Sequence, residues 1–322
     1  MSDTWKAVLG LLASGERLSG SAIGEQLGIS RSAVWKHMQQ LQQWGVPVRK
    51  HRGQGYQIEG GIELLSHSGI SSQLSPVAGD LLRELHLLDH IDSTNIYAKN
   101  LLENGRGAGQ VCLAERQTQG RGRLGRTWVS PFGRNIYLSA TWEFDQGVAV
   151  MEGLSLAVGV AVCRTIRELG ITEAGLKWPN DILLEGRKVG GILLEMLGDP
   201  IGPCQVVVGI GINFAMPVNA EIDQPWADLG GRQSLSRNGL AAALISKLLP
   251  LLSTYAEQGF SPYREPWEDF DSHRDESVRL ITPGKTIHGV ARGVSDTGEI
   301  CLEVNGEEQY FSGGEISLRR VQ

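Results

Sequence analysis

Residues 120–128 concentrate groups that could bind an anion. The stretch is Gly-Arg-Gly-Arg-Leu-Gly-Arg-Thr-Trp, so three glycines, three arginines and a tryptophan fall within nine residues, and no carboxylate occurs between Arg116 and Ser130. Glycine lets the backbone come close to a ligand, and successive backbone N–H groups in such a turn can surround an anion. The stretch therefore predicts a site for a carboxylate or phosphate, with an aromatic ring of the ligand near Trp128. A mobile basic surface loop is the simpler alternative.

The same stretch matches the dinucleotide-binding pattern G-x-G-x-x-G. That fingerprint opens a helix directly after a strand. Here residues 128–133, Trp-Val-Ser-Pro-Phe-Gly, follow, and they are typical of extended chain and a turn. The context argues against a nicotinamide cofactor.

Two further polar clusters could complete an anion site. Asp92-Ser93-Thr94-Asn95 precedes a helix expected over 96–103, and the unpaired N–H groups of a helix start favour anions. Capping explains one or two of these four residues, so we expect contact with a polar ligand as well. The second cluster, Lys177-Trp178-Pro179-Asn180-Asp181, follows a short strand and places a cation, an amide and a carboxylate within five residues.

The first 60 residues predict a head that binds DNA. Apolar spacing indicates helices near 5–12 and 21–27, and Ser30 can cap a third helix from Arg31 to about Trp44. Two helices joined by a short turn that contains glycine form the helix-turn-helix arrangement. A basic hairpin over 46–58 follows as a wing. A three-helix protein-interaction module is the alternative, and the basic wing favours DNA.

Six polar side chains of the head are the candidates for DNA contact. Those of the third helix are expected at the major groove, and those of the wing are expected on phosphates, which supply salt-dependent affinity but little sequence information. The candidates are Ser32, Lys36 and Gln39 on the helix and Arg49, Lys50 and Arg52 on the wing.

Composition limits the remaining choices. The 322 residues carry a net charge of −6, which is not that of a general nucleic-acid binder. Residues 1–60 hold seven Lys/Arg and four Asp/Glu, whereas the rest hold 23 and 32, so a basic head is joined to an acidic body. The four cysteines lack zinc or disulfide spacing, and the N-terminus lacks a signal-peptide layout. We expect a cytoplasmic protein without a membrane span.

The remaining chain predicts an α+β multidomain protein. Strands are expected near 85–89, 111–115, 135–142, 181–195 and 206–213, with helices over 154–169, 240–255 and 263–270. Short alternating stretches from Ser277 onward predict a small β-barrel. We expect a winged helix-turn-helix domain at 1–62, a linker at 63–80, a mixed α/β domain at 81–272 and an SH3-like barrel at 273–322.

Taken together, the motifs resemble those of the biotin–protein ligases. Five of them occur in the family's order between residues 80 and 270: Asp92–Asn95 with Gln117, the loop at 120–128, Lys177–Asp181, residues 187–192 (Arg-Lys-Val-Gly-Gly-Ile) and residues 209–213 (Gly-Ile-Gly-Ile-Asn). With the head and the barrel, the whole chain is similar to the bifunctional bacterial type, which is both ligase and biotin operon repressor.

The resemblance implies two half-reactions. Biotin and MgATP give biotinyl-5′-adenylate and pyrophosphate, and a lysine of the biotin carboxyl carrier protein of acetyl-CoA carboxylase then takes the biotinyl group. Joining two anions requires cations that offset their repulsion. No tightly bound prosthetic group is expected, and no cysteine lies in a motif.

The resemblance also assigns roles to residues. Lys188 would lie between the biotin carboxylate and the α-phosphate, with Arg123 as its catalytic partner. Asp181 is the leading Mg²⁺ candidate. For Lys188 the alternative is a solvated hairpin lysine, and for Asn213 a plain strand end. The implied biotin contacts are Ser93, Thr94, Asn95, Gln117, Arg121, Gly122, Arg123, Lys188 and Gly191. The implied ATP or adenylate contacts are Arg123, Arg126, Trp128, Lys177, Asn180, Asp181 and Asn213.

The glycine- and arginine-rich loop also suggests regulation. We expect the adenylate to order this loop and to favour a homodimer that pairs two heads on operator DNA, with the strand at 135–142 as the exposed edge of that dimer. Two other functions stay open at this point. A lipoate-type ligase shares the chemistry, although the loop and the motif at 177–181 favour biotin, and a pure transcription factor could use the pocket only as a sensor.

Overall fold

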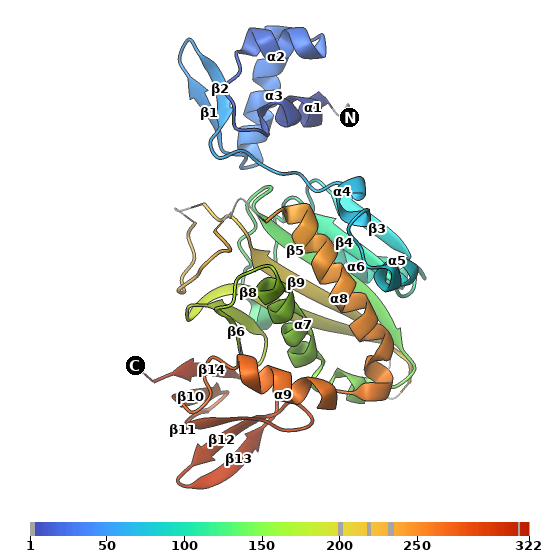
Figure 1. The fold of residues 1–322 in the computed structure, drawn as a ribbon, viewed down its shortest axis with the longest axis vertical. Coiled ribbons are helices and arrows are strands. Elements are labelled where there is room, and N and C mark those ends of the chain that lie inside the picture. The colour runs from blue at the N-terminus through green and yellow to red at the C-terminus, as the bar shows by residue number, and fades with distance from the viewer. Residues whose placement is uncertain (1–3, 199–201, 218–219, 231–234, 315, 322) are drawn as a thin grey trace.

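The computed structural model describes residues 4–198, 202–217, 220–230, 235–314 and 316–321. It places a small N-terminal head at one end of the long axis, a larger domain in the middle and a C-terminal sheet at the other end (Figure 1). This arrangement confirms the predicted α+β multidomain class.

The head has the predicted winged helix-turn-helix elements. They are α1 (Thr4–Leu12), α2 (Gly20–Leu27), α3 (Arg31–Gln43), β1 (Val48–His51) and β2 (Gly55–Ile58). The hydroxyl groups of Ser19 and Ser30 accept hydrogen bonds from backbone N–H groups in the first turns of α2 and α3, so they cap these helices. Gly28 ends α2 with φ of 64°, a left-handed conformation that glycine adopts without strain. The strands β1 and β2 form the expected wing.

The prediction that residues 63–80 form a linker is wrong in part. Residues 63–80 contain α4 (His67–Ser71) and most of α5 (Pro76–Leu81), and both helices pack on α8 (Arg237–Gln258). Serines and a proline suggested a flexible segment, but Ser66 and Ser75 are N-caps and Pro76 is the first residue of α5. This stretch therefore belongs to the central domain.

A seven-stranded sheet forms the centre of the molecule, in the order β3-β4-β5-β9-β8-β7-β6. Neighbouring strands are antiparallel except for β3 and β4, which are parallel. Their bounds are β3 (Glu84–Leu88), β4 (Gln110–Ala114), β5 (Asn135–Phe144), β6 (Ala174–Lys177), β7 (Asp181–Leu184), β8 (Arg187–Gly198) and β9 (Cys204–Asn213).

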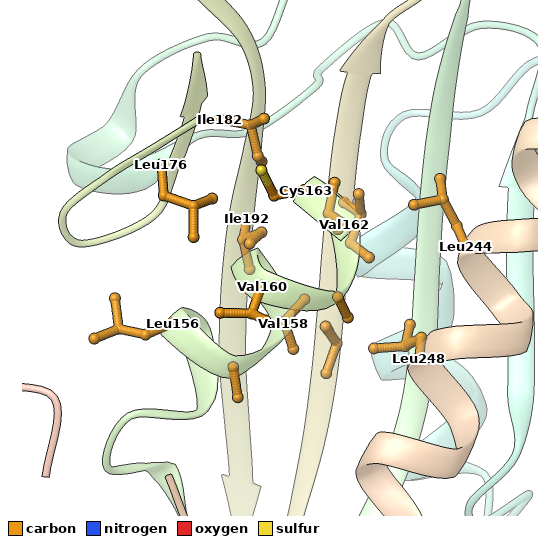
Figure 2. Close-up of a cluster of buried hydrophobic side chains, with 14 of the residues drawn as sticks. Leu156, Val158, Val160, Val162, Cys163, Leu176, Ile182, Ile192, Leu244 and Leu248 are labelled. Carbon is orange, nitrogen blue, oxygen red and sulfur yellow. The ribbon is translucent and has the colours of Figure 1, made fainter. Parts of the chain in front are cut away.

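The helices α7 (Leu154–Glu168) and α8 cover one face of this sheet. Figure 2 shows Val158 and Val160 of α7 near Ile192 of β8, with Leu248 of α8 alongside. The segments Val148–Glu168 and Arg237–Gln258 are long and apolar enough to cross a membrane by length and composition, but 61% and 56% of their apolar windows are buried inside the protein. Such burial is typical of core helices.

The opposite face carries α6 (Thr94–Glu103), which packs on β4, β5 and β9. Ala98 and Leu102 of this helix form a small core with Cys112 and Val207. The helix thereby places its N-terminal residues over the middle of the sheet, beside the glycines of β8 and β9.

The prediction that the strand at 135–142 is an exposed edge is wrong. β5 lies between β4 and β9 and pairs with both. Apolar and polar residues alternate along this strand, a pattern typical of a half-buried strand, but every side chain from Asn135 to Thr141 is buried. The longer β8 extends past β7, which pairs with it only as far as Gly191, so among the described residues the far part of β8 has a free edge.

The C-terminal domain follows α9 (Ser261–Phe270). It is a five-stranded antiparallel sheet in the order β13-β12-β11-β10-β14, which agrees with the predicted small β domain. Its strands are β10 (Ser277–Thr282), β11 (Lys285–Val294), β12 (Ile300–Val304), β13 (Glu307–Phe311) and β14 (Ser317–Arg320), of which the last was not predicted.

Candidate active site

A cavity of about 1170 Å³ lies where the glycine-rich loop, the central sheet and the C-terminal sheet meet. All but one of the predicted substrate-binding residues line it, although they come from five separate parts of the chain. The lining predicted residues are Ser93, Thr94, Asn95, Gln117, Arg121, Gly122, Arg123, Arg126, Trp128, Lys177, Asn180, Asp181, Lys188 and Gly191.

Asn213 is the exception. It is 4% exposed and does not line the cavity. Its side-chain amide donates to the carbonyl of Ala227 at 3.0 Å, and its Oδ1 lies 3.4 Å from Asn135 Nδ2. Its side chain ties the end of β9 to neighbouring backbone, so the structure does not bring Asn213 together with the other predicted residues, and its contact with the nucleotide stays a prediction.

Glycines form the floor of the cavity. Gly191 of β8 and Gly211 of β9 are paired in register, and a Cβ atom added to Gly211 would lie 2.7 Å from Trp128 Cε2. A Cβ atom on Gly209 would lie 2.2 Å from Asn95 Oδ1. These glycines let the indole and the amide lie directly on the sheet.

One end of the cavity is a hydrogen-bonded polar cluster. The backbone N–H and the hydroxyl of Thr94 lie 2.8 and 3.1 Å from Gln117 Oε1. Asn95 donates to Glu195 Oε2 at 2.6 Å, and its Oδ1 lies 2.6 Å from the hydroxyl of Ser139. The orientations of both amides are thus fixed before a ligand enters.

Sequence reasoning did not identify Ser139 or Glu195 as part of this cluster. Ser139 lies on β5, whose alternating sequence predicts a half-buried strand, and Glu195 lies on β8, the strand that carries the motif at 187–192. A carboxylate in the pattern Val-Gly-Gly-Ile-Leu-Leu-Glu, three residues beyond the motif, was the available signal.

The other end of the cavity is a charge cluster around Asp181. Lys188 Nζ lies 2.5 Å from its Oδ1, and Lys177 Nζ lies 3.0 Å from its Oδ2. Burial alone would raise the pKa of Asp181, but the two ammonium groups outweigh it and lower the pKa below the ordinary value. The carboxylate is therefore ionised and holds both lysines.

The glycine-rich loop closes on itself by backbone bonds. Gly122 donates to the carbonyl of Arg126 at 2.7 Å, and Trp128 donates to that of Gly120 at 2.9 Å. At its tip, Leu124 is exposed and has φ of 56°, an uncommon conformation for a residue with a side chain.

Arg123 links this loop to two other parts of the site. Its guanidinium donates to Asn180 Oδ1 at 3.1 Å and also to the carbonyl of Gly314 in the C-terminal domain. Burial lowers the pKa of Arg123, and the nearby Asp181 opposes this effect. Arg123 is thus held at the junction of the loop, the motif at 177–181 and the C-terminal sheet.

The C-terminal domain adds cations that the sequence did not place at the site. Arg279 of β10 and Arg319 of β14 are opposite each other in register, and both line the cavity. Like charges directly across a sheet destabilise it, and neither has an ion-pair partner within the described part of the chain. An anion between them would relieve that repulsion.

The residues predicted for Mg²⁺ do not form a dedicated metal site. Across the described ranges, no group of three or more His, Cys, Asp or Glu side chains could hold an ion. Asp181 is a single carboxylate occupied by two lysines. A metal at this site would therefore need most of its ligands from a substrate, as is usual for Mg²⁺ and nucleotide phosphates.

The head presents its predicted DNA contacts to solvent. Ser32, Lys36 and Gln39 are exposed on α3, as are Arg49, Lys50 and Arg52 on the wing. Arg49 differs from the others because it pairs with Glu59 at 2.6 Å.

An aromatic contact joins the head to the central domain. Phe132 lies four residues after Trp128, is fully buried and belongs to the hydrophobic core of the head. Its ring centroid is 6.3 Å from that of Trp5 and 6.5 Å from that of Trp44. The segment that leaves the glycine-rich loop is thus packed into the head.

Comparison with known families agrees with this division of the chain. Residues 87–213 match the biotin/lipoate A/B protein ligase family, residues 4–57 match a helix-turn-helix domain, and residues 273–319 match the biotin protein ligase C-terminal domain.

Relatives of similar length share the whole architecture. The chain is 43% identical to the bifunctional ligase/repressor BirA of Salmonella typhimurium and 41% identical to that of Escherichia coli, in each case over 98% of this chain and 97% of the relative. Among solved structures, biotin protein ligase from Aquifex aeolicus, in complex with biotin and ATP, matches with a TM-score of 0.64 and 28% identity. That match covers 74% of this chain and all of the other.

Proposed function

The chain belongs to the biotin protein ligase family, in the bifunctional form that is also a repressor, and we propose which of its residues carry out each of the two functions. It is an ATP-dependent ligase that converts biotin to biotinyl-5′-adenylate and transfers it to a lysine of a biotin carboxyl carrier protein. Its head binds DNA to repress biotin synthesis, with the adenylate as corepressor.

We place the biotin ring system in the polar cluster at the start of α6. Thr94, Asn95 and Gln117 line this end of the cavity, and the bonds from Ser139 and Glu195 hold the Asn95 amide in one orientation. Preformed donors and acceptors of this kind cost little reorganisation when a urea-like group binds. The biotin side chain then runs toward Lys188, past the Asn95 amide and the Trp128 indole that cover Gly209 and Gly211.

The charge cluster carries the activation step. A carboxylate oxygen of biotin forms a bond to the α-phosphorus of ATP, and the bond to pyrophosphate breaks. Negative charge accumulates at this junction, where Lys188 supplies a compact cation. The pairing of Lys188 and Lys177 with Asp181 is the observation that carries this assignment, because it holds two cations in place in advance.

The nucleotide lies between the loop and the C-terminal sheet in this proposal. Trp128 packs against the adenine, and Arg123 and Arg126 bind the phosphates. Arg279 and Arg319 lie opposite each other at the cavity rim, a position suited to the leaving pyrophosphate. Mg²⁺ would enter on the ATP phosphates and offset their charge, with Asp181 as its protein carboxylate.

The second step needs no enzyme nucleophile. The neutral amine of the carrier lysine attacks the acyl carbon of the adenylate, AMP leaves, and the amine loses a proton. All four cysteines are buried, and burial raises the pKa of Cys112 to about 12. Positioning and charge stabilisation therefore account for the catalysis.

Regulation would use the loop and the free edge of β8. We propose that the adenylate orders the loop at 120–128 and that Phe132 transmits this order to the head, whose core it joins. Dimerisation through β8 would then pair two heads on a two-fold operator. The outer edge of β8 is the candidate because it is unpaired beyond Ile192 among the described residues.

We also place this protein in the cytoplasm, where ATP and the carrier are found.

One assay separates this function from its alternatives. The full chain is incubated with ATP, an apo carrier domain and labelled biotin, lipoate or octanoate in parallel. Transfer of biotin alone is the expected result. Preferential transfer of lipoate or octanoate would indicate a lipoate-type ligase, and no transfer of any acid would leave a sensor that only regulates transcription.

A further inference from the structure

One exposed tryptophan lies on the helix that faces DNA. The chain has eight tryptophans, and Trp35 is the one that is exposed, at 45% of its surface. Its neighbours Val34 and Met38 are buried in the core of the head, whereas Trp35 does not belong to that core. The indole therefore contributes little to the folding of the head.

The surroundings of Trp35 are polar and cationic. On α3, Ser32 precedes it by three residues and Gln39 follows it by four, so one helical face presents all three side chains. All are exposed, as is Lys36. Lys36 of the helix and Lys50 and Arg52 of the wing have no ion-pair partner within the described part of the chain. Unpaired cations next to Trp35 on the helix and on the wing of the same head favour a polyanion over an apolar protein surface as the partner of this head.

The major groove offers a single apolar group to such a side chain. Phosphates and base edges are polar, and the C5-methyl group of thymine is the exception. We propose that Trp35 reads sequence by packing its indole on a thymine methyl group in each operator half-site. The flanking polar side chains contact neighbouring base edges, so the indole fixes the position of at least one A·T pair.

This inference rests on the DNA-binding role of the head, and the experiment separates the two. Duplexes that bind the full chain in the presence of biotin and ATP are first selected from a random-sequence pool. Each thymine of the selected site is then replaced by deoxyuridine, which removes only the methyl group. Affinity is measured for the native protein and for the variants Trp35→Ala, Trp35→Leu and Lys36→Ala.

At one thymine position per half-site, deoxyuridine should lower the affinity of the native protein about threefold to fivefold, because burial of one methyl group contributes a free energy of that size. The affinity of Trp35→Ala should not change when deoxyuridine replaces thymine at that position. Trp35→Leu keeps an apolar side chain and should therefore show part of the loss seen with the native protein. Lys36→Ala should weaken all duplexes and leave the position-specific loss intact. Adenylate formation by every variant should match that of the native protein.

Two results would overturn the inference while leaving the DNA-binding role in place. One is a native protein that tolerates deoxyuridine at every position, and the other is a Trp35→Ala protein that is as sensitive as the native one. Failure to select any duplex would instead refute the DNA-binding role, and this inference with it.

Discussion

Lys188 and Asp181 face each other across two neighbouring strands, with Nζ of the lysine 2.5 Å from Oδ1 of the aspartate. Lys177 holds the second oxygen at 3.0 Å. Fixed charges of this kind stabilise a transition state without reorganisation during the reaction. In the proposed function, the pair explains how a lysine with the sequence pattern of an ordinary hairpin residue is held in place for the junction of two anionic substrates.

The contact between Gly209 and Asn95 predicts a selective loss of biotin binding. In a Gly209→Ala variant the new Cβ atom would lie 2.2 Å from Asn95 Oδ1, so the amide must leave its place. We expect the KM for biotin in pyrophosphate exchange to rise about 5-fold to 150-fold, since one displaced hydrogen-bonding group is worth about 1–3 kcal/mol.

Gly79→Ala is a matched control, because a Cβ atom at Gly79 in α5 has nothing within 4 Å. Removing this helical glycine should leave KM unchanged and stabilise the protein by up to about 1 kcal/mol. An unchanged KM in Gly209→Ala would contradict the position that we assign to biotin.

Arg237 predicts a large loss of stability. It is 1% exposed, contacts Glu115 at 2.8 Å and donates to the carbonyl of Asn135. Arg237→Met would leave the buried carboxylate of Glu115 unpaired, at a cost of about 3–5 kcal/mol in the free energy of unfolding. Guanidinium denaturation measures this change.

The exposed pair of Lys247 and Glu168 provides the comparison. Lys247→Met should cost less than about 1 kcal/mol, because solvent screens that pair. Similar losses of unfolding free energy in the two variants would show that the buried pair stabilises the fold no more than the exposed pair does.

Asp271 predicts an unusual pH dependence of stability. Burial raises its pKa to about 6 from the ordinary value of 3.8. Between these values the folded state binds more protons than the unfolded state, so this group lowers stability as pH rises through that window. Each pKa unit is worth about 1.4 kcal/mol, so the penalty is on the order of 2–3 kcal/mol above pH ~6.

Asp271→Asn should remove this penalty. Burial lowers the pKa of the nearby His273, which gives the opposite slope, so the difference between variant and native protein is the quantity to follow. We expect the variant to gain stability relative to the native protein from pH ~4 to ~7. A constant difference across that range would contradict the assignment.

The free edge of β8 predicts a variant that separates ligation from regulation. The N–H and C=O of Ile192 point away from β9, since they bond with Asn180, so the N–H of Met196 on the same strand points outward too. Met196→Pro removes that N–H without breaking the ladder to β9. Ligand-linked dimerisation and operator affinity should fall while adenylate formation persists, as measured by sedimentation and pyrophosphate exchange.

Native-like dimerisation of Met196→Pro would exclude this edge as the interface. Equal operator affinity of the native protein with and without biotin and ATP would contradict the whole coupling between loop and head.

Local patterns in the sequence predicted most of the helices and strands. The head is the clearest case, because Trp5, Val8, Leu9 and Leu12 share one helical face and all are buried. The motif residues also converge on one cavity, because the start of α6, the loop at 120–128 and the strands β6, β7 and β8 meet there.

The failures concern properties that depend on distant parts of the chain. Alternation along 135–142 cannot tell a central strand from an edge strand, because the partners of β5 lie about 25 and 70 residues away. For the same reason the sequence did not predict Arg319 at the site, because this residue reaches the cavity only through the pairing of β14 with β10. Asn213 follows a motif pattern, yet its side chain turns toward Ala227.

Pyrophosphate exchange by Lys188→Ala tests the central claim most directly. With biotin present, ATP–pyrophosphate exchange should fall by about 10²–10³, the effect of removing one charge-stabilising donor, while circular dichroism shows an intact fold. Arg187→Ala is the control, because the adjacent Arg187 is exposed and pairs only with Glu185 at 3.2 Å among the described residues, and it should stay within about twofold of the native rate. Exchange by Lys188→Ala at the native rate would contradict the role of Lys188 in joining biotin to ATP.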